Sequence, residues 1–68
     1  MFDINKQVAA VAREIAFRRS FYPKQVRLGK MSPNDAEYQI EIMEAVLTTL
    51  KKAQELQTNL ERISSHAA

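Results

Sequence analysis

The stretch that most constrains this chain is residues 32–63, which predicts one long helix. Ser32 supplies a hydroxyl suited to cap a helix N-terminus, and Pro33 suits the first helical position, where its missing N–H has no intrahelical partner. Asp35 then lies near the positive end of the helix dipole. No glycine and no further proline follows, and most residues are good helix formers.

Two apolar stripes run along this predicted helix, each with the alternating four-and-three spacing of a single helical face. The first contains Ala36, Ile40, Met43, Leu47 and Leu50. The second contains Ile42, Val46, Thr49, Ala53, Leu56, Leu60 and Ile63. Because an ordinary surface helix needs one apolar stripe, two adjacent stripes predict two different neighbours.

The N-terminal half predicts the first of these neighbours. A helix capped by Asp3 or Asn5 and running to about Ser20 carries an apolar stripe in the same rhythm, formed by Ile4, Val8, Val11, Ile15 and Tyr22. The connection before Ser32 is too short for anything but an antiparallel return. The predicted fold is therefore an all-α antiparallel helical hairpin with a long second helix, as a single domain over residues 1–63 with a frayed tail at 64–68.

Proline and glycine predict the details of the corner. Pro23 removes a hydrogen bond and disfavours helical geometry at Tyr22, so we expect a kink or break near residues 20–22. A short helical segment from Pro23 to about Leu28 should follow. Gly29 should end that segment, because glycine readily adopts positive φ.

Size and composition predict that the second stripe is covered by another chain. A chain of 68 residues buries little surface alone, and without cysteine it has neither disulfides nor thiolate metal ligands. One histidine, His66, cannot build a metal site, so no metal or cofactor is predicted. We expect a homodimer, a four-helix bundle of coiled-coil type. Its predicted interface is Ile42, Val46, Ala53, Leu56, Leu60 and Ile63.

Charge is divided unevenly along the chain. Residues 1–31 hold seven Lys and Arg against two acids, a net of +5, whereas residues 32–68 hold three against six, a net of −3. The two halves could simply complement each other, or the basic half could contact an anionic partner. The candidate binding patch for a protein or nucleic acid is Arg13, Phe17, Arg18, Arg19, Phe21, Lys24, Arg27 and Lys30.

Phe17 and Phe21 fall outside the apolar stripe of the first helix. Either a bend tucks them into the core, or they form a surface for another subunit. Cations interleaved with aromatic rings also occur in proteins that bind single-stranded nucleic acids. The helix after the corner begins with acids, however, which phosphates would repel.

Catalysis is not predicted. The chain offers no Ser-His-Asp or Cys-His set and no glycine-rich phosphate loop. Glu37, Glu41 and Glu44 share one face and resemble half of a carboxylate metal site, but the first helix lacks the carboxylates to complete it. The N-terminus is too charged for a signal peptide, and no run is long enough to cross a membrane.

The corner and the helix after it resemble short, uncharacterised open reading frames of tailed bacteriophages and prophages. The resemblance lies in Tyr22-Pro23, Val26 and Gly29-Lys30-Met31, which fit a YP-x2-V-x2-G-(K/R)-M pattern, followed by Ile40 and Met43-Glu44-Ala45. It covers roughly residues 4–51. It implies a phage or prophage source and the cytoplasm of a bacterial host, and it carries no activity. We therefore expect a non-enzymatic interaction protein that binds and modulates a host or phage protein; the alternative is a nucleic-acid-binding accessory protein.

Overall fold

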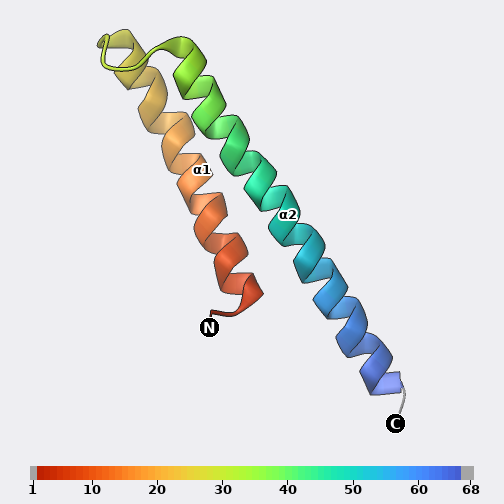
Figure 1. Ribbon diagram of the computed structural model, residues 1–68. Coiled ribbons are helices and arrows are strands. Elements are labelled where there is room, and N and C mark those ends of the chain that lie inside the picture. The colour runs from red at the N-terminus through yellow and green to blue at the C-terminus, as the bar shows by residue number, and fades with distance from the viewer. Residues whose placement is uncertain (1, 67–68) are drawn as a thin grey trace.

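Two antiparallel helices form the whole fold in the computed structural model, which describes residues 2–66 (Figure 1). Helix α1 spans Ile4–Arg27 and helix α2 spans Pro33–His66. They form a rod with extents of 60 × 17 × 16 Å. The described residues contain no β-strand, so the all-α helical hairpin expected from the sequence is confirmed.

Both helices begin at the side chains that the sequence marks as caps. The Asp3 carboxylate accepts a hydrogen bond from the backbone N–H of Asn5 at 2.8 Å. The Ser32 hydroxyl accepts one from the N–H of Asp35 at 3.1 Å. Each bond satisfies a backbone donor that has no partner within its own helix.

The break expected near residues 20–22 does not occur, because α1 continues through Pro23 to Arg27 as one helix. Pro23 lies in the last turns of α1, where its missing N–H removes a single bond close to the helix end. Tyr22 and Val26, on either side of it, are both half-buried against α2. This packing holds the two sides of Pro23 in line, so the predicted separate segment does not form.

Helix α1 ends at Gly29 through a Schellman motif, a pair of backbone hydrogen bonds that closes the last turn. The N–H of Gly29 donates to the Val26 carbonyl at 3.0 Å, and the N–H of Lys30 donates to the Gln25 carbonyl at 2.9 Å. Gly29 has φ 73°, the only positive φ among the described residues. The positive φ expected at this glycine is confirmed.

Replacing Gly29 with alanine is expected to lower the free energy of unfolding by about 1–2 kcal/mol, the usual cost of left-handed geometry in a residue with a Cβ. A Cβ added at Gly29 would meet no atom within 4 Å, so the cost comes from the backbone alone. Thermal unfolding followed by circular dichroism measures it. Gly29→Asn, which tolerates this geometry better, should lose less; equal losses for both variants would contradict the explanation.

The core lies along the seam between the two helices, as the sequence predicts. Ile15 of α1 and Ala36 of α2 are buried, at 5% and 8% exposure. The other members of the α1 stripe and of the first α2 stripe are all half-buried. They are Ile4, Val8, Val11 and Tyr22 on α1, and Ile40, Met43, Leu47 and Leu50 on α2.

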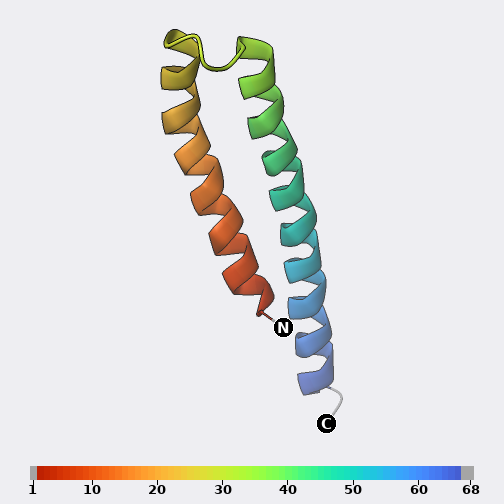
Figure 2. The same ribbon diagram turned by 60° about the vertical axis from the view of Figure 1, so that its left-hand side comes forward.

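Helix α2 continues well beyond the start of α1 (Figure 2). The Gln54 side-chain amide donates to the Asn5 side chain at 2.6 Å, which places the first turn of α1 opposite residue 54. Residues 55–66, called here the C-terminal extension, therefore have no helix of the same chain beside them. The helix also passes the domain boundary expected at residue 63 and reaches His66, while residues 67–68 of the expected tail lie outside the described residues.

Candidate interaction surfaces

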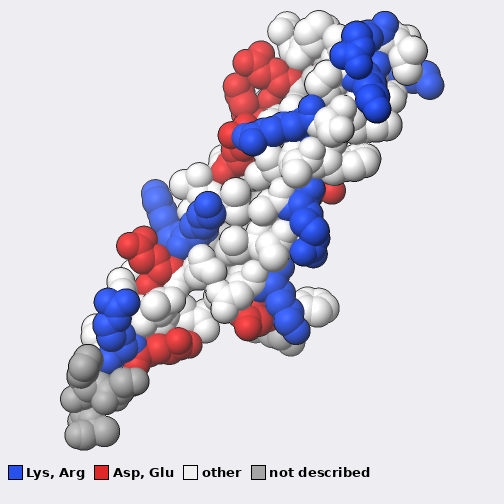
Figure 3. Space-filling model, turned by 180° about the vertical axis from the view of Figure 1, so that it is seen from behind, with Lys and Arg blue, Asp and Glu red and all other residues white. Residues whose placement is uncertain are grey.

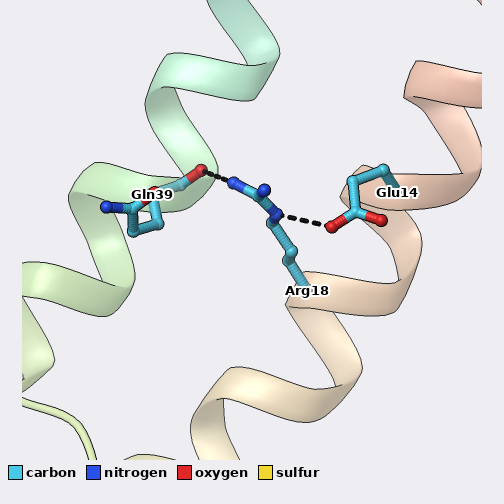
Figure 4. A network of polar contacts seen from close by, with 3 residues as sticks. All are labelled: Glu14, Arg18 and Gln39. Carbon is cyan, nitrogen blue, oxygen red and sulfur yellow. Dashed lines mark hydrogen bonds and ion pairs between the residues drawn. The ribbon is translucent and has the colours of Figure 1, made fainter.

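Arg18 joins the two helices on one side of the seam (Figure 4). Its guanidinium donates through Nη1 to the Gln39 carbonyl and through Nε to Glu14, each at 2.8 Å. It also lies 5.7 Å from the centre of the Tyr22 ring, and its side chain is 18% exposed. The sequence places Arg18 in a basic binding patch, but these contacts commit it to the hairpin itself.

Arg19 marks the opposite side of the seam. Its guanidinium forms an ion pair with Glu44 of α2 at 3.0 Å, with both side chains about half exposed. Glu44 is one of the three acids considered as part of a metal site, and it is here paired with an arginine. The opposite charges of the two halves thus meet across the hairpin, which supports internal complementarity for this part of the sequence.

These contacts divide the hairpin into two flanks. Counting about 100° per residue from the seam, Phe17 and Phe21 lie on the side of α1 that carries Glu14. Ile42 and Val46 lie on the side of α2 that carries Gln39. Because Arg18 joins Glu14 to Gln39, both pairs belong to one surface, called here the apolar flank. Arg19 and Glu44 lie on the other, charged flank.

The two phenylalanines of the apolar flank are exposed. Phe17 is 55% and Phe21 41% exposed, so the interpretation that a bend tucks them into the core is wrong. Their rings stack on each other at 5.2 Å, and Phe21 lies 6.3 Å from the Tyr22 ring. The two stacked rings form one exposed apolar feature on α1.

The second stripe of α2 is also uncovered. Ile42 and Val46 are 42% and 39% exposed, and Ala53 is exposed too. On the C-terminal extension, Leu56, Leu60 and Ile63 are each 64–65% exposed. Helix α1 covers only the first stripe, so the second neighbour inferred from the sequence is not provided by this chain.

Basic side chains collect at the loop end and along α1. In Figure 3 Lys and Arg side chains gather at the loop end and along the α1 edge, and acids line the α2 edge near the loop, while basic and acidic side chains are mixed along the rest of α2. Four members of the predicted patch are exposed and form no ion pair among residues 2–66: Arg13, Lys24, Arg27 and Lys30. We call these four the basic outer face. Four of the six cations in the predicted patch are therefore free to attract an anionic partner.

A shallow groove of about 390 Å³ extends this basic outer face toward the N-terminus. It is lined by Phe2, Lys6, Gln7, Ala9, Ala10 and Arg13. The sequence analysis missed Phe2, Lys6 and Ala9 as surface candidates. The signal was present, because Phe2, Lys6, Ala10 and Arg13 follow the same helical spacing as the buried stripes.

The remaining features give no site of another kind. Within the described part of the chain, no group of three His, Cys, Asp or Glu residues is placed to hold a metal ion. Neither described helix has the length and apolar character needed to cross a bilayer. No protein-family model, curated protein or solved structure matches this chain.

Proposed function

We propose that this chain is a small, non-enzymatic interaction protein that acts as a homodimer and binds and modulates another protein. The observation that carries this proposal is the amount of apolar surface that the hairpin leaves uncovered. Its buried core consists of Ile15 and Ala36, whereas ten large apolar side chains stay exposed among the described residues. Soluble monomers rarely expose a contiguous patch of this kind unless it is a binding surface.

Two distinct surfaces support two distinct contacts. The apolar flank and the C-terminal extension suit a second copy, because they carry most of the exposed large apolar side chains. The basic outer face suits a different occupant, since its four cations and the adjacent groove offer charge together with apolar contact. A protein surface with acids around an apolar centre has the matching chemistry. The resemblance to phage reading frames makes a host or phage protein in the bacterial cytoplasm the proposed partner.

Nucleic-acid binding through residues 13–30 is the second candidate. The exposed cations Arg13, Lys24, Arg27 and Lys30 favour it, since phosphate contacts require accessible charge. Arg18 and Arg19 weaken it, because their guanidinium groups are held by contacts within the hairpin. Phe17 and Phe21 also stack on each other, which leaves less ring surface for bases.

Affinity capture from a bacterial host lysate, followed by mass spectrometry, tests the proposal. The parent should retain a specific protein, and Arg13→Glu combined with Lys24→Glu should lose it. Lys51→Glu with Lys52→Glu makes the same change in net charge on α2 and should retain it. Loss in both double variants would indicate a net-charge effect and count against the basic outer face.

The parent and the Arg13→Glu, Lys24→Glu variant also test nucleic-acid binding. The protein-binding function predicts no mobility shift of oligonucleotides at physiological salt. A shift by the parent that weakens steeply with rising salt and disappears in the Arg13→Glu, Lys24→Glu variant would establish nucleic-acid binding instead.

A further inference from the structure

We propose that the C-terminal extension of a second copy lies on the apolar flank, with the two α2 helices antiparallel and the two-fold axis near Ala53. This inference rests on the proposed homodimer and deepens it. It assigns Phe17 and Phe21 to the dimer interface, not to the surface that binds another protein.

The first step is to establish which residues of α1 and α2 lie at the same level along the rod. Arg18 lies opposite Gln39 and Asn5 lies opposite Gln54, which places Phe17 at about the level of Ile42. Both are on the apolar flank. Phe21, Ile42 and Val46 are therefore exposed on the same flank close to the loop, and Phe17 stacks on Phe21 farther round α1. We call these four side chains the patch of the apolar flank.

The spacing of the second stripe allows it to pair with the same stripe of an antiparallel partner helix. Reversed about Ala53, the stripe matches itself to within one residue: Val46 meets Leu60 of the partner helix, and Ile42 lies within one position of Ile63. An antiparallel α2 pair thus places the extension of each copy over the patch of the other. Ile63 reaches the level of Phe17, and each extension gains the neighbouring helix that its own chain lacks.

The exposed apolar area is close to the minimum for a biological interface. The large side chains involved are 39–65% exposed, and they are Phe17, Phe21, Ile42, Val46, Leu56, Leu60 and Ile63. With roughly 150–200 Å² for each whole side chain, they offer on the order of 500 Å² per copy. Two copies bury about 1,000 Å² from these residues alone, which is about the minimum that a biological interface should clear.

Charge selects the antiparallel arrangement over the parallel one. Parallel hairpins would bring the two basic loop ends together, with Lys24, Arg27 and Lys30 from each copy side by side. Antiparallel hairpins place these ends far apart. They also direct the negative C-terminal end of each α2 dipole toward the basic half of the other copy.

Cysteine cross-linking tests the arrangement cleanly, because the native chain has no cysteine. Oxidation of the Ile42→Cys, Ile63→Cys double variant should give a covalent dimer in high yield. The Ile63→Cys single variant should stay monomeric on denaturing gels, because its two sulfurs would lie about 30 Å apart at 1.5 Å per residue. Efficient cross-linking of Ile63→Cys alone would establish the parallel arrangement and overturn the proposal.

A second measurement tests the role of the phenylalanines. Phe17→Glu should weaken dimerisation at least tenfold in sedimentation equilibrium, because it places a charge under the partner's extension. Leu28→Glu is the matched control: Leu28 is 65% exposed but lies nearer the loop than the partner helix reaches. Equal dimerisation of the parent and of Phe17→Glu would show that the aromatic pair is not part of the interface.

The mass of the parent in solution distinguishes a failure of the antiparallel arrangement from a failure of the homodimer itself. If the parent is a dimer but the double-cysteine variant does not cross-link, the homodimer is supported and the antiparallel arrangement is overturned. A parent that is monomeric at all concentrations overturns the homodimer itself.

Discussion

Replacing Ile15 with alanine is expected to lower the free energy of unfolding by about 2–4 kcal/mol, as for other large-to-small changes in a core. Ile15 is 5% exposed and sits midway along the seam, where it contributes more to the core than any other side chain of α1. A chain of this length has a total stability of roughly 3–10 kcal/mol at 0.05–0.15 kcal/mol per residue. The loss is therefore a large share of the total stability, and at the lower end of that range Ile15→Ala leaves a large fraction of the molecules unfolded.

Urea denaturation followed by circular dichroism at 222 nm measures this change, at equal protein concentration because dimerisation adds to the apparent stability. Leu28→Ala is the matched control, since it removes an apolar side chain that is 65% exposed. It should change the free energy of unfolding by less than about 0.5 kcal/mol. A parent-like midpoint for Ile15→Ala would show that the seam is not the core.

The seam could be predicted from the sequence because it depends only on spacing within each helix. Ile15 and Ala36 belong to regular four-and-three stripes, and a short corner at Gly29 leaves one way to bring the stripes together. The continuation of α1 through Pro23 could not be predicted as well. The cost of Pro23 to a helix is local and readable, whereas the packing of Tyr22 and Val26 that offsets this cost depends on where α2 lies.

The surfaces were only partly predictable for the same reason. The second stripe is visible in the sequence, and so is the aromatic pair, but each was placed on its own helix without reference to the other. Their union on one flank depends on how the helices are rotated against each other, which the contacts of Arg18 and Arg19 reveal. The sequence likewise grouped those two arginines with the exposed cations, because charge alone does not show which guanidinium groups the hairpin itself holds.

Replacing Leu60 with glutamate is expected to convert the dimer to monomers, with a dissociation constant at least about 100-fold higher. Burial of a leucine is worth about 1.5–3 kcal/mol, and a two-fold interface loses it twice. Leu60 is 64% exposed in the hairpin, so the isolated chain should tolerate the change. Light scattering over a concentration series measures the shift in mass.

Circular dichroism gives an independent readout of the same variant. An uncovered helix end of about ten residues is marginal in water, so monomeric Leu60→Glu should lose part of the helix signal of residues 55–66. Thr58→Glu introduces the same charge on the opposite side of the extension and should keep both the mass and the helix signal of the parent. If Leu60→Glu remains a fully helical dimer, the second copy must cover some other surface, and the uncovered leucines of α2 would need a different occupant.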